Sequence, residues 1–264
     1  MAQINKYGLK RYIPENIKKE VRLRCGFGCV VCGGMFYDYE HFDPVFEECQ
    51  SHNAEGITLL CGRHHTNKTR NFFPLSAVKK ANNNPFAKRN GFWEDLTFDS
   101  IPPTILLGSN KTRCCRDVFI INNTKILCID PPECVDSPYL VSACFFDNDN
   151  NEILNIEKNV IKGNVGNIDV VAKGGVVNIK SLKKSITLLE LSLKSQPFQF
   201  EISELNMAYN GSKIEINKQG ELKIRNTFGG GITLNKSEFN APSLSDTFCI
   251  KIHPCGRIDG FGYN

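Results

Sequence analysis

The apolar positions in the first third of the chain recur mostly at helical spacing. Ile17, Val21 and Cys25 follow Pro14 at intervals of three or four residues, and Gly26 comes directly after them. Proline is tolerated in the first turn of a helix, and glycine commonly ends one. The pattern therefore predicts a helix that begins near Pro14 and ends before Gly26.

Short apolar runs predict the other elements of this region. They are a tight hairpin at CVVCGG, a strand at FYDYEHF, a strand at GITLLC, and helices at GRHHTNKTRN and PLSAVKKANNNPF.

From about residue 95 the pattern changes to short β-branched and aromatic segments, separated by Asn, Gly, Asp and Pro. This pattern is typical of an all-β sandwich or open barrel. A β-solenoid is the second choice, because no fixed repeat period stands out. We expect an α+β chain with a small domain at residues 1–94, a β-rich domain at 95–264 and a linker around residues 87–103.

Composition narrows the class of protein. The 264 residues are 41% hydrophobic and 23% charged, with no apolar run near 18 residues, so we expect no membrane partner. The N-terminal residues lack the apolar core of a secretion signal, which favours a reducing, cytoplasmic location. The twelve cysteines are then metal-bound or buried free thiols rather than a disulfide framework, and buried thiols are the expectation for those after residue 100.

Charge is spread unevenly. Residues 1–90 carry 14 Lys/Arg against 8 Asp/Glu, a balance of +6, and the remaining residues carry 18 against 20, a balance of −2. A basic first part points to a polyanionic partner, although a solvated basic surface would give the same count.

Two ligand pairs in the first part have metal-site spacing. Cys29 and Cys32 are spaced as in a zinc knuckle, and Cys61 with His64 repeats the Cys-x-x-ligand spacing. Zinc prefers four such ligands in a tetrahedron. We expect these four residues to bind one structural Zn²⁺, and the alternative is a set of cysteines buried in a small core.

His64 and His65 are adjacent, and neighbouring side chains of a helix point about 100° apart. The two imidazoles therefore serve different sites, or one of them is incidental. With His64 assigned to zinc, His65 is left for a second site. Glu40 and His41 on the predicted strand are its candidate partners, and because neighbouring strand residues face opposite sides, one would line the site while the other flanks it.

The segments RCGFGCVVCG, YEHFDP, GITLLCGRHHTNKT and LSAVKKANNNPF, in this order, resemble an HNH endonuclease of the ββα-metal type. They are similar to bacterial proteins that combine such a module with a β-rich C-terminal region. The motifs cover about residues 22–86. The resemblance implies metal-dependent hydrolysis of phosphodiester bonds in DNA.

The resemblance also implies roles for the second site. His41 would be the general base, and Glu40 and His65 would hold a catalytic Mg²⁺, Mn²⁺ or other divalent ion. The alternative for His41 is a half-buried strand histidine without a catalytic role.

One position departs from the family pattern. The middle residue of the motif, usually Asn, falls near Gly56, which has no side chain to bind metal or orient the base. Asn53 or His52 would have to substitute. His52 is thus a further candidate metal ligand, or simply an exposed loop residue.

Lys68 follows His65 by three residues on the same helical face, and Arg63 and Arg70 lie on the same predicted helix. We expect these three cations to contact the DNA backbone, or else to be solvated surface charges.

The competing function is a non-catalytic, zinc-dependent nucleic-acid-binding protein whose β domain recruits partners. In either case the β domain is expected to bind a protein partner, a ligand or a second copy of the chain.

Overall fold

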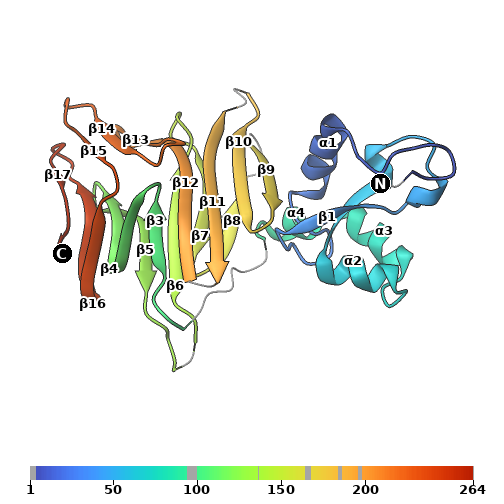
Figure 1. Ribbon diagram of the computed structural model, residues 1–264, viewed down its shortest axis with the longest axis horizontal. Helices are drawn as coiled ribbons and strands as arrows, with labels where there is room; N and C mark the ends of the chain where they lie inside the picture. The colour runs from blue at the N-terminus through green and yellow to red at the C-terminus, as the bar shows by residue number, and fades with distance from the viewer. Residues whose placement is uncertain are drawn as a thin grey trace. The chain divides into compact units, whose positions relative to one another are not determined.

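The computed structural model describes residues 4–93, 100–135, 137–163, 168–183, 186–195 and 198–263. The chain divides into two compact units, residues 1–94 with 169–174 and residues 95–168 with 175–264. The structure is mixed α and β and consists mostly of strand (Figure 1). No described helix is long and apolar enough to cross a membrane.

The first unit combines short helices with a two-stranded sheet. Its elements are α1 (Glu15–Cys25), β1 (Tyr37–His41), η1 (Phe46–Glu48), η2 (Ala54–Gly56), β2 (Ile57–Cys61), α2 (Gly62–Thr69), α3 (Leu75–Asn83) and α4 (Phe86–Asn90). The predicted strands and the helices α1, α2 and α3 are confirmed. CVVCGG forms a turn rather than a strand hairpin, because neither of its arms pairs as a strand.

Helix α1 follows the sequence rule that predicted it. Pro14 precedes its first residue with φ −57°, and Gly26 ends it in the left-handed conformation with φ 73°. Its inner face buries Val21 and Cys25 against Ile57 and Leu59 of β2.

The two strands β1 and β2 pair antiparallel from Tyr37 opposite Cys61 to His41 opposite Ile57. Helix α2 begins directly after Cys61, so the chain passes from β2 into α2 without a loop. The result is two antiparallel strands followed at once by a helix. This arrangement brings the end of β1 and the face of α2 to one site.

The predicted linker at residues 87–103 contains structure that the sequence did not indicate. Its first four residues belong to α4, and Trp93 is buried with its indole Nε1 donating to the carbonyl of Gly26 at 2.9 Å. Residues 94–99 lie outside the described residues. Part of this segment therefore belongs to the packed first unit. A linker would leave its side chains exposed, whereas Trp93 buries a large aromatic ring.

The remaining strands belong to the second unit, except that residues 169–173 of β9 are grouped with the first unit. In chain order they are β3 (Thr104–Leu107), β4 (Asn110–Ile121), β5 (Thr124–Asp130), β6 (Leu140–Phe146), β7 (Glu152–Glu157), β8 (Val160–Gly163), β9 (Ile168–Lys173), β10 (Val176–Ser181), β11 (Thr187–Ser195), β12 (Phe198–Tyr209), β13 (Ser212–Ile216), β14 (Leu222–Asn226), β15 (Gly231–Leu234), β16 (Glu238–Ile252), β17 (Ile258–Asp259) and β18 (Gly262–Tyr263).

These sixteen strands form one hydrogen-bonded sheet among the residues described, and the sheet curls into a half-barrel. Most neighbours are antiparallel, but β12 pairs parallel with β3 and β16 pairs parallel with β4. The all-β prediction is confirmed here. Of the two predicted architectures, a single curled sheet agrees with the open barrel rather than with two separate sheets.

The core of this unit follows the two-residue period of its strands. Along β12, buried Phe198, Phe200 and Ile202 alternate with more exposed residues.

The expectation of buried thiols after residue 100 holds for Cys115, Cys128 and Cys249 and is wrong for two others. Cys134 and Cys255 are exposed, and neither lies in a strand.

Candidate metal centre and catalytic pocket

Four side chains from two separate segments meet at one point of the first unit. Cys29 and Cys32 lie in the turn after α1, and Cys61 and His64 lie at the junction of β2 and α2. The turn closes by a hydrogen bond from the Gly33 amide to the Cys29 carbonyl at 2.7 Å. Gly33 has a φ of 81°, a conformation that favours glycine at this position.

The ligand atoms have the spacing that a tetrahedral zinc ion requires. With Zn–S near 2.3 Å and Zn–N near 2.0 Å, two sulfurs stand about 3.8 Å apart, and a sulfur and a nitrogen about 3.5 Å apart. The Sγ atoms of Cys32 and Cys61 are 3.7 Å apart, and Nδ1 of His64 lies 3.5 Å from Sγ of Cys29. A third spacing, Cys61 Sγ to His64 Nδ1, is shorter at 3.2 Å.

The donor set also fits zinc chemically. All four ligand atoms lie within 4.8 Å of one another. Among the described residues, this is the one group of three or more His, Cys, Asp or Glu side chains close enough to hold a metal ion. Hydrogen bonds from the Cys29 and Cys32 thiols lower the pKa of Cys61, and the same contacts raise the pKa of Cys32 and of Cys29. A metal ion binds the thiolate form. These residues could therefore hold a structural metal ion such as zinc.

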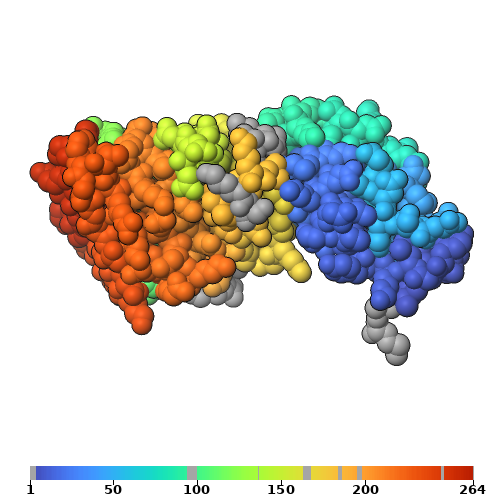
Figure 2. Space-filling model, turned by 90° about the horizontal axis from the view of Figure 1, so that it is seen from above, coloured from blue at the N-terminus to red at the C-terminus, as the bar shows by residue number. Residues whose placement is uncertain are grey.

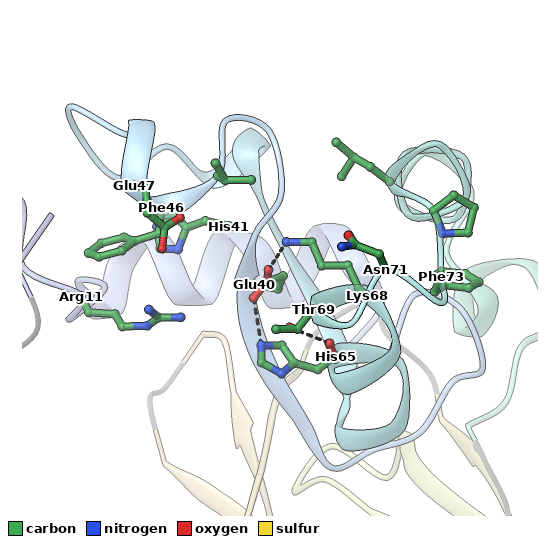
Figure 3. Close-up of a pocket in the computed structure, with 13 residues that line it drawn as sticks. Arg11, Glu40, His41, Phe46, Glu47, His65, Lys68, Thr69, Asn71 and Phe73 are labelled. Atoms are coloured by element: carbon green, nitrogen blue, oxygen red, sulfur yellow. Dashed lines mark hydrogen bonds and ion pairs between the residues drawn. The ribbon is translucent and has the colours of Figure 1, made fainter. Parts of the chain in front are cut away.

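A second site lies in a cavity of about 540 Å³ in the first unit. Its lining includes four residues singled out from the sequence, namely Glu40, His41, His65 and Lys68 (Figure 3). His64 and His65 therefore face different sites, as their adjacency on a helix requires. Glu40 and His41 both line the cavity, so the expectation that one would only flank it was wrong. His41 is the last residue of β1, where strict alternation ends.

Glu40 is the centre of the polar contacts in this pocket. Its Oε2 lies 2.9 Å from Nε2 of His65, and Lys68 forms an ion pair with its other oxygen (Figure 3). The Glu40 side chain is only 10% exposed. One carboxylate and one imidazole side by side are suitable ligands for a divalent ion that keeps its other positions for water and phosphate.

His41 is buried beside the same carboxylate and packs on the ring of Phe46, with ring centroids 5.3 Å apart. Burial, followed by the nearby His52, lowers the pKa of His41 to about 4. The imidazole is therefore neutral at physiological pH, which a proton acceptor requires.

His52 contacts His41 and not the Glu40–His65 pair. Its Nδ1 lies 3.0 Å from Nε2 of His41, and its Nε2 lies 3.0 Å from the carbonyl oxygen of Lys10. Both ring nitrogens are thus engaged, so this geometry does not support His52 as a metal ligand. Because a carbonyl only accepts, Nε2 of neutral His52 must donate and its Nδ1 must accept. His41 then donates from Nε2 and keeps a lone pair on Nδ1.

Gly56 and Asn53 serve the backbone of this loop. A Cβ on Gly56 would lie 2.4 Å from the carbonyl oxygen of Asp43, so only glycine fits at this close approach. The Asn53 side chain accepts a hydrogen bond from the amide of Glu55 and caps η2. Neither residue reaches His41 by a described contact, and it is His52 that contacts the His41 ring.

The three predicted DNA-binding cations differ in their placement. Lys68 lies in the pocket, whereas Arg63 on α2 and Arg70 directly after it are exposed and do not line the pocket. Neither arginine makes an ion pair with any residue that the structure describes.

Several pocket residues were missed by the sequence analysis. Arg11, Phe46 and Glu47 form one wall, and Asn71 and Phe73 form another (Figure 3). They come from loops without periodic pattern, and the N-terminal loop is tied to the others by Asn5, whose side chain donates to the carbonyls of Phe46 and Cys49 at 2.7 Å each. The only sequence signal was the density of aromatic and charged residues in these loops.

Comparisons of the chain with protein-family models, curated proteins and solved structures found no match.

Proposed function

We propose that the chain is a metal-dependent endonuclease of the HNH type, which hydrolyses phosphodiester bonds in DNA. The observation that carries this proposal is the pocket beside α2. It places a neutral buried imidazole, His41, next to a carboxylate, Glu40, that already contacts a second imidazole, His65. These are the residue types that phosphodiester hydrolysis needs at one point.

In this proposal His41 activates water. Its Nε2–H is held by His52, which leaves Nδ1 to take a proton from a water molecule in the pocket. The water oxygen then bonds to phosphorus, the bond from phosphorus to the 3′ oxygen breaks, and that oxygen is protonated by solvent. The contact with the Lys10 carbonyl fixes the tautomer, as a third group does in other base-catalysed sites.

Glu40 and His65 would hold a divalent ion, either Mg²⁺, Mn²⁺ or another. When bound, the ion supplies charge stabilisation to the phosphate oxygens and the leaving oxygen. Lys68 makes an ion pair with Glu40, and the Lys68 side chain is 17% exposed. Once an ion takes its place on Glu40, Lys68 is free to contact a phosphate.

Nucleic acid is the favoured substrate because of the charge of the segment that carries the pocket. Residues 62–93 contain seven cations and no Asp or Glu; the cations are Arg63, Lys68, Arg70, Lys79, Lys80, Lys88 and Arg89. In Figure 2 the turquoise atoms of the α2–α4 segment gather along one edge of the first unit. A continuous cationic segment of this kind binds phosphates without reading sequence.

A second candidate function is zinc-dependent nucleic-acid binding without cleavage. It is favoured by the ion pair between Lys68 and Glu40, because the carboxylate is already neutralised by a cation of the chain. In that case the cationic segment would still bind DNA, and the β-rich unit would recruit partners.

Cleavage of DNA, supplied both as plasmid and as single strands, separates the two candidates. The full chain should cut in the presence of Mg²⁺ or Mn²⁺, and His41→Ala should lose most of this cutting while it keeps its zinc. His253→Ala is the matched control, since His253 also contacts a carboxylate, Asp259 at 2.7 Å, but lies in the second unit. Equal cutting by His41→Ala and the unaltered chain would refute the catalytic proposal. Binding without any cutting would favour the second candidate.

A further inference from the structure

The segment after α2 is held by a regular set of backbone hydrogen bonds. The amide of Phe72 donates to the carbonyl of Asn67 at 2.8 Å, and the amide of Asn71 donates to that of Lys68 at 3.1 Å. Asn71 is left-handed, with φ 59°. This is the Schellman pattern, which fixes the backbone at the end of a helix.

The side chains on this fixed segment are apolar and exposed. In a Schellman motif the residue at the Phe72 position usually packs back on the helix. Here Phe72 is instead 76% exposed, and Leu75 is 39% exposed. The next residue, Phe73, packs on the ring of His64 with centroids 5.5 Å apart and anchors the segment next to the metal centre.

This segment is also the rim of the pocket. Asn71, Phe73, Pro74 and Leu75 line the cavity that contains Glu40 and His65. Phe72 lies between two lining residues but is not itself part of the lining. The backbone of Phe72 is therefore part of the pocket rim, and its ring faces solvent.

We propose that Phe72 stacks on an unpaired base next to the phosphate held in the pocket, so that single-stranded nucleic acid is the substrate class. This inference rests on the proposed function. A flat aromatic ring has few rotatable bonds, and one carried on a backbone that is fixed before binding loses little conformational entropy when a base stacks on it. The exposed Arg63 and Arg70 on the same helix favour a polyanion over an apolar protein surface as its partner.

Fluorescence of Phe72→Trp tests the stacking without any cleavage. The only native tryptophan, Trp93, is 1% exposed, so a tryptophan at position 72 is distinguished by its solvent-exposed emission. A single-stranded oligodeoxythymidine, added without Mg²⁺ or Mn²⁺, should quench that emission. Heparin, a polyanion without bases, should not.

Phe228→Trp is the matched control, because Phe228 is 70% exposed but belongs to the second unit. Its emission should not respond to the oligonucleotide. Equal quenching of both variants, quenching of Phe72→Trp by heparin, or no quenching at all would overturn the proposal. Equal quenching by duplex and by single strand would overturn the assigned substrate class.

Binding affinity gives the second measurement. Base stacking on an aromatic side chain predicts that Phe72→Ala binds the oligonucleotide about 5- to 100-fold more weakly, with Phe228→Ala unchanged. Unaltered zinc content and Trp93 emission would show that Phe72→Ala is folded. Unchanged affinity of Phe72→Ala would refute stacking. If stacking is observed and no condition gives cleavage, the nuclease proposal fails and the base-binding role of Phe72 stands.

Discussion

The two units of this chain are stabilised by different means. The second unit closes its core with strands of one sheet, whose buried side chains alternate as in β12. The first unit has two strands of five residues each and short helices, and its turn after α1 is joined to α2 by the Cys29, Cys32, Cys61 and His64 cluster. A small domain with little apolar core usually needs such a cross-link. The candidate chemistry lies in the unit whose Cys and His cluster could hold such a cross-linking ion.

The two units also differ in charge and in the use of their histidines. The first 90 residues have a balance of +6, and the remainder has −2. Four of the five histidines lie in the first unit, and all four take part in one of its two sites. The comparison suggests that the first unit acts on a polyanion and the second provides a stable platform or partner surface.

Loss of the metal centre should have the largest effect. Because zinc binding in such sites contributes on the order of 10 kcal/mol to folding, Cys32→Ser should unfold the first unit and leave the sheet folded. Emission of Trp93, which is buried in the first unit, should shift to the red, and elemental analysis should show no zinc. The β signal in circular dichroism should persist.

Cys134→Ser is the control for this substitution, because Cys134 is exposed in the second unit. It should alter neither zinc content nor Trp93 emission. A Cys32→Ser protein with one zinc per chain and native Trp93 emission would contradict the proposed metal centre.

The His41 side chain should be needed for rate and not for zinc binding. A general base contributes roughly 10²–10⁴-fold, so His41→Ala should cut DNA slower by that factor while its zinc content stays at one per chain. Cleavage rate and elemental analysis of one preparation give both numbers. A rate within threefold of the unaltered chain would exclude His41 as the base.

The adjacent histidines should behave differently from His41 and from each other. His65→Ala removes a ligand of the catalytic ion, so raising the Mn²⁺ or Mg²⁺ concentration should restore part of its rate. His64→Ala removes a ligand of the structural ion, so it should lose zinc and Trp93 emission should change. Identical behaviour of the two variants would mean that they do not serve separate sites.

Much of this arrangement followed from local sequence pattern. The helix ending at Gly26, the strands before and after the loop, and the two Cys-x-x-ligand pairs all depend on residues close in sequence, whose geometry is set by the backbone. The split between His64 and His65 followed from helix geometry alone. These features need no knowledge of distant contacts.

The parts that could not be predicted depend on contacts between distant segments. The His41–His52–Lys10 contacts join three loops or strand ends, and no period in the sequence relates them. Arg11 enters the pocket because Asn5 ties its loop to residues 46–49. Trp93 looked like part of a linker because its partner, the Gly26 carbonyl, is 67 residues away.

A core substitution in the sheet should destabilise the second unit without affecting the first. Phe200 is fully buried on β12, and Phe200→Ala should lower the free energy of unfolding by about 3–5 kcal/mol. Denaturant unfolding followed by circular dichroism should show the loss, with zinc content and Trp93 emission unchanged. Loss of zinc in this variant would mean that the two units are not independently stabilised.

Gly56→Ala should have a smaller effect, confined to the first unit. The added Cβ would meet the Asp43 carbonyl oxygen, so the loop must shift at a cost of about 1–3 kcal/mol. Denaturant unfolding followed by Trp93 emission measures this cost. Gly62→Ala is the matched control, because a Cβ there meets nothing within 4 Å. Equal stability of the two variants would show that the Gly56 loop relaxes freely.

The smallest expected effect concerns the exposed cations of α2 and its C-terminal end. Removing one of them tests whether the two units differ in their contact with a polyanion. Arg70→Gln should weaken DNA binding only a few-fold, because one phosphate contact among several is lost. The measurement is the salt dependence of DNA binding. In Arg70→Gln, the slope of the logarithm of the binding constant against the logarithm of the salt concentration should fall by roughly one unit. Arg257→Gln, which removes an exposed arginine of the second unit, should leave the slope unchanged. The same reduction in slope for both variants would assign the polyanion contact to the whole chain, and the division of labour between the units would be wrong.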